Sequence, residues 1–307
     1  MEIIDAQIHE PHIGGSLRAR IPADIPLDEK TETWVNVELA REAIDSLGVQ
    51  GAVVFARQEF NEAAVERYPD MFAGVAVFDY AAEDLEEQIA AFAAKPGMIG
   101  CRTLLTNYGQ VWRNPDETLK LNPDFAAGKY DRYFELADKY RLPIFIGGHD
   151  FGAEVQPYAE KYPDLTIVVD HFGITQSLAR PVEGDRWQAL PRLLEIARYP
   201  NVFVKMCGAP LVSRDPYPYK DVWPHLHAIL KAFGAGRCMW ASDFTRQRWG
   251  TSTPPDASGF PPRQDWIGYS RALHYLLDTD EIGRSDKEEL FAGAVRRALG
   301  WPNAKGA

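Results

Sequence analysis

The chain has little of several features that mark large classes of protein. Only three of its 307 residues are cysteine, and its net charge is −11 rather than positive. It has no run of 18 apolar residues, and its N-terminus has no basic and then apolar leader. These absences argue against a disulfide-built, nucleic-acid-binding or membrane-spanning protein and lead us to expect a cytoplasmic one.

The few cysteines each lie inside an apolar run. They are Cys101, Cys207 and Cys238, an odd number whose spacing fits no metal knuckle. We therefore predict buried, reduced thiols.

Strand-like and helix-like patterns alternate along the whole chain. Most strand candidates are continuous apolar runs, as expected for parallel strands that are covered on both faces. The eight candidates are 3–9, 51–56, 72–78, 98–105, 142–149, 165–171, 202–208 and 238–244. Eight alternating units in a chain of this length predict a single domain, residues 1–307, folded as a (β/α)8 TIM barrel. A doubly wound open sheet is the alternative, but its glycine-rich phosphate loop after the first strand is missing.

Long loops follow some of the predicted strands. We expect them at 10–37, 106–129, 209–222 and 245–264. All four follow the carboxyl ends of strands, where barrel enzymes keep their sites, whereas the turns at the other end are short. The asymmetry predicts a functional mouth.

Four polar residues stand at the carboxyl ends of predicted strands. They are His9, His149, His171 and Asp243. The first and last strands of a barrel are neighbours, so we expect His9 beside Asp243, with Gln7 on the same face as His9. Such a cluster can bind a divalent metal through imidazole and carboxylate groups. It can also work without metal, with the carboxylate as general base on water.

Basic residues near this mouth predict an anionic substrate. Arg246 and Arg248 lie in a loop that has little acid, within an acidic chain. Arg102 lies inside a strand, where it is either paired within the barrel or directed at a substrate carboxylate. Lys205, also inside a strand, is read as a charge-paired structural lysine rather than a Schiff-base former.

Five motifs, in this order along the chain, carry a resemblance to a known family. They are Asp5-Ala-Gln-Ile-His9, Gly148-His-Asp150, Asp170-His-Phe-Gly173, Asn201-Val-Phe-Val-Lys-Met-Cys-Gly208 and Trp240-Ala-Ser-Asp-Phe244. Together they resemble the amidohydrolase superfamily, specifically its amidohydrolase-2 branch of small lactonases and decarboxylases. The last two look especially like the lactonases.

The resemblance implies roles for particular residues. His9, His149 and Asp243 become the metal- or water-binding group, His171 the catalytic or substrate-polarising histidine, and Asp243 the base. Metal-binding relatives usually have His-x-His on the first strand, where this chain has Gln7, which we assign with Arg102, Arg246 and Arg248 to substrate binding. A site with zinc or manganese and a site without metal both stay open, because a glutamine amide is a poor zinc ligand.

The expected function is hydrolysis of an ester-like bond in a small carboxylated substrate, and a lactone is the substrate that we expect. A metal-dependent decarboxylase of an aromatic or muconate-like acid is the first alternative, and a non-catalytic ligand-binding barrel is the second. We expect no nucleic-acid or membrane partner, and the sequence leaves a homo-oligomer open.

Overall fold

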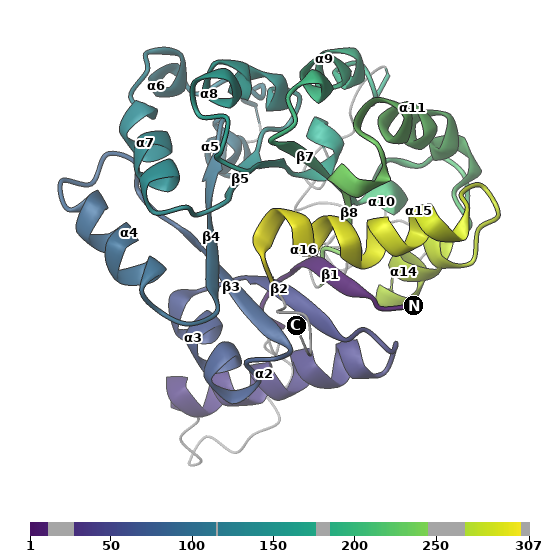
Figure 1. Cartoon of the computed structure of the whole chain (residues 1–307), viewed down its shortest axis with the longest axis horizontal. Helices are drawn as coiled ribbons and strands as arrows, with labels where there is room; N and C mark the ends of the chain where they lie inside the picture. The colour runs from purple at the N-terminus through teal and green to yellow at the C-terminus, as the bar shows by residue number, and fades with distance from the viewer. Residues whose placement is uncertain (12–27, 115, 176–184, 245–267, 302–307) are drawn as a thin grey trace.

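The computed structural model describes residues 1–11, 28–114, 116–175, 185–244 and 268–301. Eight parallel strands form one sheet, in which each strand pairs with the next in sequence order (Figure 1). The strands are β1 (Ile4–Ile8), β2 (Gly51–Phe55), β3 (Phe72–Val77), β4 (Met98–Leu104), β5 (Ile144–Gly147), β6 (Ile167–Val169), β7 (Val202–Cys207) and β8 (Cys238–Ala241). All eight predicted strands are confirmed.

The sheet closes between its first and last strands. The Asp243 amide donates to the Gln7 carbonyl at 3.0 Å, and the His9 amide donates to the Phe244 carbonyl at 2.5 Å. Ile8 and Phe244 form a parallel bridge at the same seam. The predicted TIM barrel is therefore confirmed.

Helices surround the strands (Figure 1). The α-helices are α2 (Glu29–Asp45), α3 (Gln58–Arg67), α4 (Leu85–Ala93), α5 (Tyr108–Arg113), α6 (Pro123–Ala126), α7 (Asp131–Lys139), α8 (Gln156–Lys161), α9 (Leu190–Glu195), α10 (Ala209–Val212), α11 (Trp223–Phe233), α14 (Tyr269–Leu277), α15 (Arg284–Glu288) and α16 (Ala294–Leu299). The 3₁₀ helices are η1 (Gly152–Val155), η2 (His171–Gly173), η3 (Ile196–Arg198), η4 (Lys220–Val222) and η5 (Ala235–Arg237), and η6 (Glu289–Gly293) is a π-helix between α15 and α16. Within the described ranges, no helix has the length and apolar character needed to cross a membrane.

The predicted loop boundaries need correction in three places. The loop expected at 10–37 is too long, because α2 begins at Glu29, where Asp28 caps it by accepting from the Thr31 amide at 2.7 Å. The segment 106–129 contains α5 and α6, and 209–222 contains α10 and η4. These one- or two-turn helices are too short to show a clear apolar period in the sequence.

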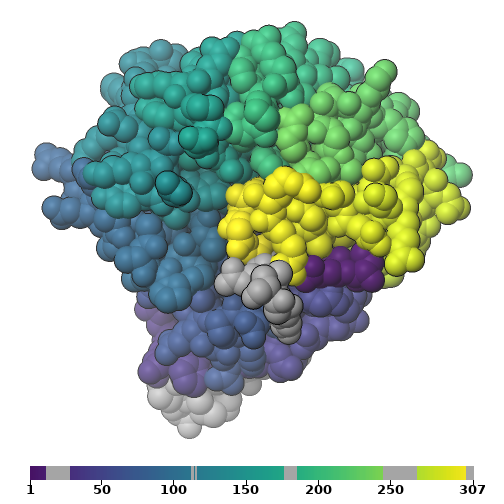
Figure 2. Space-filling view, viewed as in Figure 1, coloured from purple at the N-terminus to yellow at the C-terminus, as the bar shows by residue number. Residues whose placement is uncertain are grey.

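Two apolar layers hold the barrel together. The outer layer lies between the strands and the helices that cover them. The inner layer fills the barrel and includes Phe55, Phe145, Val168 and Met239. Residues of the C-terminal segment, Val295 among them, pack into this inner layer, and Figure 2 shows that segment (yellow) lying across the middle of one face. The segment therefore packs against residues that lie inside the barrel.

An irregularity in β1 sets the direction of the residues that follow it. Ile4 and Ala6 belong to the inner layer, so strict alternation would point Gln7 outward. The register between β1 and β2 shifts between Asp5 and Ile8, and Ile8 belongs to the outer layer. A bulge of this kind moves the next side chains to the other face, which turns Gln7 inward.

Candidate active site

The backbone is left-handed at the carboxyl ends of three strands. The φ angles are 38° at His149, 53° at His171 and 54° at Asp243. Such angles are uncommon outside glycine and gather at functional sites, where the surrounding structure maintains them. The neighbouring Gly148 is needed at the β5 end, because a Cβ there would lie 2.6 Å from the Gly152 Cα.

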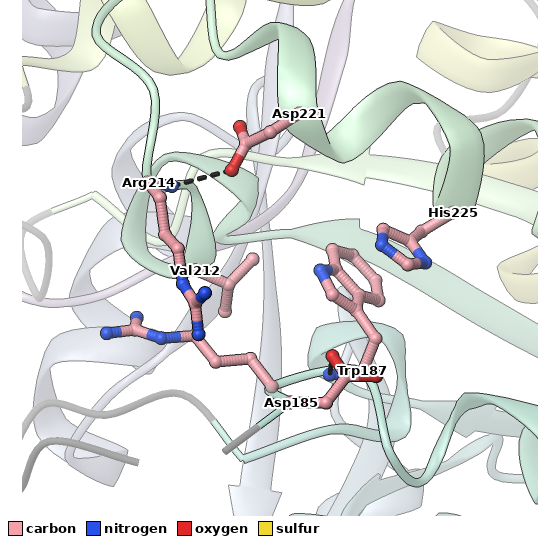
Figure 3. A pocket seen from close by; sticks show the side chains of 7 residues that line it. Asp185, Trp187, Val212, Arg214, Asp221 and His225 are labelled. Carbon is pink, nitrogen blue, oxygen red and sulfur yellow. Dashed lines mark hydrogen bonds between the residues drawn. The ribbon is translucent and has the colours of Figure 1, made fainter. Parts of the chain in front are cut away.

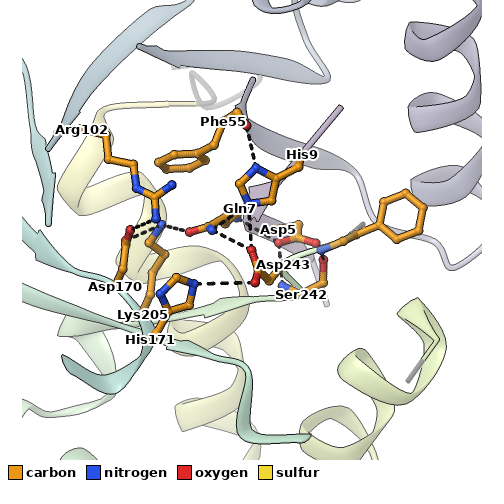
Figure 4. Close-up of polar contacts among 11 residues, drawn as sticks. Asp5, Gln7, His9, Phe55, Arg102, Asp170, His171, Lys205, Ser242 and Asp243 are labelled. Carbon is orange, nitrogen blue, oxygen red and sulfur yellow. Dashed lines mark hydrogen bonds and ion pairs between the residues drawn. The ribbon is translucent and has the colours of Figure 1, made fainter. Parts of the chain in front are cut away.

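Asp243 is the centre of a polar network at the seam (Figure 4). Its side chain is fully buried. Oδ1 accepts from Gln7 Nε2 at 2.8 Å and lies 2.9 Å from His9 Nε2. Oδ2 lies 3.7 Å from His171 Nε2, beyond hydrogen-bond distance. The fold thus brings together side chains from β1 and from the ends of β6 and β8, which are far apart in sequence.

The electrostatic surroundings keep Asp243 ionised. Burial alone would raise its pKa, but the polar contacts and positive charge of His171 and His9 outweigh burial and hold the pKa well below its usual value. The carboxylate is therefore ionised at neutral pH.

A row of buried charges lies beside this network (Figure 4). Asp170 Oδ1 pairs with Lys205 Nζ at 2.7 Å, and Asp170 Oδ2 pairs with the Arg102 guanidinium at 2.9 Å. Lys205 Nζ also donates to Gln7 Oε1. The charge-paired interpretation of Lys205 is confirmed, and of the two alternatives for Arg102 the structure shows the pairing within the barrel.

The remaining predicted site residues lie in different surroundings. His149 is buried and its ring stacks on Tyr108 with 4.5 Å between centroids, while the His171 ring centroid is 6.4 Å away. Gln7 is fully buried, and its amide contacts Lys205, Asp243 and His9, so the structure shows it in contact with protein partners. The predicted substrate contacts Arg246 and Arg248 lie outside the described residues.

His9 connects Asp243 to β2. Its Nδ1 lies 2.7 Å from the Phe55 carbonyl oxygen and its Nε2 lies 2.9 Å from Asp243 Oδ1. A ring protonated on both nitrogens would donate to both oxygens, in agreement with the positive charge that lowers the pKa of Asp243. Nearby, Asp243 Oδ2 and His171 Nε2 are buried and make no hydrogen bond to the described residues. These two atoms are therefore the ones that a divalent metal could contact.

Cys207 is a site neighbour that the sequence did not single out. Potential ligand atoms of His171, Cys207 and Asp243 lie within 4.8 Å of one another, a group that includes the predicted ligand Asp243 but neither of the predicted ligands His9 and His149. Burial, followed by the Asp243 charge, raises the pKa of the Cys207 thiol well above its usual value, so the thiol is neutral. The position of Cys207 at the carboxyl end of a predicted strand was the one sequence signal that could have placed it near the site. All three cysteines are buried and reduced, as predicted.

Asp5 binds the backbone next to the network, and its pKa predicts how the stability of the protein depends on pH. Its Oδ1 accepts from the amides of Gln7 at 3.0 Å and Ser242 at 2.9 Å, and burial raises its pKa from 3.8 to about 6. The folded state therefore binds the proton more tightly than the unfolded state, so this contribution to stability is lost as pH rises through 6.

Asp5→Asn is expected to remove this pH dependence. Asparagine keeps the acceptor oxygen and carries no charge, so the variant should gain up to about 3 kcal/mol in free energy of unfolding over the parent between pH 4 and pH 7.5. Urea unfolding of both proteins across this range measures the difference. A difference that does not change with pH would contradict the raised pKa.

A pocket lies beyond the carboxyl ends of β6 and β7 (Figure 3). It has a volume of about 500 Å³ between the segments that follow β6 and β7. Trp187 stacks on His225 at 4.3 Å between ring centroids, and the side chains of Arg186 and Arg214 line the same pocket. None of its lining residues belongs to the network around Asp243.

The fold and the site together define the general class. A closed parallel barrel with an acid and imidazoles at the carboxyl ends of its strands is a (β/α)8 barrel of the kind that enzymes use. The chain belongs to the Amidohydrolase family, whose sequence profile matches residues 4–304. The resemblance seen in the strand-end motifs is thereby confirmed.

Two curated relatives and one solved structure illustrate what this chain is similar to. L-fucono-1,5-lactonase of Burkholderia ambifaria is 28% identical over 173 residues, which cover 55% of this chain and 54% of that protein. 4-Sulfomuconolactone hydrolase of Hydrogenophaga intermedia is 28% identical over 128 residues, covering 40% and 41%. The chain thus spans about half or less of the length of these relatives. A zinc-bound amidohydrolase from Burkholderia multivorans shares the fold, with a TM-score of 0.66, 16% identity and coverage of 98% and 100%.

Proposed function

We propose that this protein is a lactonase that opens the ester bond of a small carboxylated lactone with water. The observation that carries the proposal is the buried, ionised Asp243 at the barrel seam, with His171 3.7 Å from its Oδ2. Both curated relatives described above act on lactones by name, which supports the same substrate class.

In this mechanism Asp243 removes a proton from water as the water attacks the lactone carbonyl. Oδ1 is engaged by Gln7 and His9, so Oδ2, on the side of His171, takes the proton. His171 then stabilises the oxyanion of the tetrahedral intermediate. The proton on Asp243 passes to the ring oxygen that leaves, which regenerates the carboxylate.

We further propose that His171 and Asp243, whose potential ligand atoms lie within 4.8 Å of each other, hold a divalent cation, zinc or manganese. When bound, the ion would polarise the carbonyl and lower the pKa of the attacking water. The amide of Gln7 already contacts Lys205 through its oxygen, which leaves it outside the ligand set.

Arg102 is 8% exposed and pairs with Asp170 at 2.9 Å, a carboxylate that it shares with Lys205. The three buried groups together keep one positive charge, which supports the prediction that Arg102 attracts the carboxylate of the substrate. We propose that Arg246 and Arg248, in the segment after β8, bind the carboxylate.

A substrate screen and an elemental analysis on the same preparation test the proposal. Carboxylated sugar lactones and muconolactones, together with aromatic acids, should be supplied to protein that was purified without chelator. We expect acid release from lactones and close to one zinc or manganese ion per chain. Release of carbon dioxide from the aromatic acids without lactone opening, or ligand binding without turnover, would contradict lactone hydrolysis. Full activity in metal-free protein would contradict the proposed metal site but not the proposed lactone hydrolysis.

A further inference from the structure

Lys205 is the most deeply buried cation of the described residues, and it points toward the catalytic network (Figure 4). Its ammonium lies 4.1 Å above the ring of Phe55 and 4.7 Å from that of Phe145, on the inner layer of the barrel. It pairs with Asp170 at 2.7 Å and donates to Gln7 Oε1. Lys205 therefore links the buried charges to Gln7, the side chain that contacts Asp243.

The contact with Lys205 determines which way the Gln7 amide points. An ammonium only donates hydrogen bonds, so it must face the amide oxygen and not the amide nitrogen. The other end of the amide is then Nε2, which donates to Asp243 Oδ1 at 2.8 Å. In the flipped orientation, two acceptor oxygens would face each other across that distance and would repel.

Gln7 holds Asp243 at two points. The main-chain carbonyl of Gln7 accepts from the Asp243 amide at 3.0 Å, while the side-chain amide donates to the carboxylate. With Oδ1 engaged in this way, Oδ2 is the oxygen that makes no hydrogen bond to the described residues.

We propose that Lys205 is a positioning residue that acts through Gln7: it fixes the amide so that one carboxylate oxygen of Asp243 is held and the other is presented to water. This inference rests on the proposed lactonase activity. A role in stability alone explains Lys205 poorly, because burying an ion pair gains little and a methionine would pack on the same two aromatic rings. Without Lys205, moreover, Asp170 keeps its pair with Arg102 at 2.9 Å.

A double-mutant cycle tests the chain of contacts. Lys205→Met and Gln7→Met should each lower kcat on the order of 10²-fold, with KM within about threefold of the parent value, because the acid is misplaced while substrate binding remains. The double variant should be no slower than Gln7→Met alone, since Lys205 acts through Gln7. Losses that multiply in the double variant, or a normal kcat in Lys205→Met, would overturn the inference.

Two further variants separate positioning from folding. Gln7→Glu keeps the size of the side chain and its contact with Lys205 but removes the donor to Asp243, so it should lose kcat as much as Gln7→Met. A near-normal kcat in this variant would overturn the inference even if Lys205→Met did not fold.

Asn201, a buried amide just before the start of β7, donates to the carbonyls of Ala159, Tyr162 and Leu165 at 3.2, 2.9 and 3.0 Å. Asn201→Ala should lower Tm and leave kcat unchanged. Activity that survives Asp243→Asn would refute the proposed function, whereas failure of the cycle alone would refute only the positioning role.

Discussion

Asp243→Asn is expected to lower kcat for lactone hydrolysis by about 10³-fold, because an amide cannot accept the proton of the attacking water. Asparagine has nearly the shape of aspartate and keeps an oxygen that can accept from Gln7, so the barrel should remain closed. Steady-state kinetics, together with circular dichroism and Tm, measure the effect. The loss should fall on kcat and kcat/KM to the same extent, as for an interaction made in the transition state.

The matched control for this change is Asp278→Asn. Asp278 pairs with His274 at 2.9 Å on the surface of the barrel, and its side chain is 62% exposed. The same chemical change there should leave kcat unaltered and should change Tm little, because exposed ion pairs contribute little. A well-folded Asp243→Asn protein with a near-normal rate would exclude water activation by this carboxylate.

Asp170→Asn is expected to cost the largest amount of stability, about 3–5 kcal/mol of free energy of unfolding. The change leaves both Lys205 and Arg102 buried without their common counter-charge. Burial alone would raise the pKa of Asp170, but the charges of Lys205 and Arg102 outweigh it and lower that pKa. The stabilisation is therefore present at neutral pH and is lost as pH falls below the usual range of an aspartate.

Urea unfolding at pH 7 measures this cost, and Lys205→Met is the comparison. Removing Lys205 leaves Asp170 paired with Arg102, so the loss of stability should be clearly smaller than for Asp170→Asn. Equal losses, or a loss below about 1 kcal/mol for Asp170→Asn, would show that the two cations do not depend on this carboxylate.

The barrel was predictable because its signal is repeated. Each strand is an apolar run, and the sequence order of the runs is also their order in the sheet. The neighbourhood of His9 and Asp243 followed from closure alone, since the first and last strands must meet. The start of α2 was missed because the cap at Asp28 is a single-residue signal with weak apolar periodicity after it.

The details of the site depended on features that leave no mark in the sequence. The inward direction of Gln7 was inferred from its two-residue spacing to His9, but it depends on the register shift after Asp5, which no pattern in that stretch reveals. The partner of Arg102 lies two strands away, and sequence spacing does not show which acid it reaches. Cys207 was interpreted as a core thiol because its neighbours in β7 are apolar, although its height on the strand places it beside Asp243.

The seam between β1 and β8 has a consequence for biosynthesis. Gln7 leaves the ribosome more than 230 residues before Asp243, its hydrogen-bond acceptor. A growing polypeptide that lacks β8 has neither Asp243 nor the final wall of the ring, so under the proposed mechanism it should not turn over substrate. Turnover should thus report that the barrel has closed, and a fragment ending before Cys238 should regain it only when the missing strand is supplied in trans.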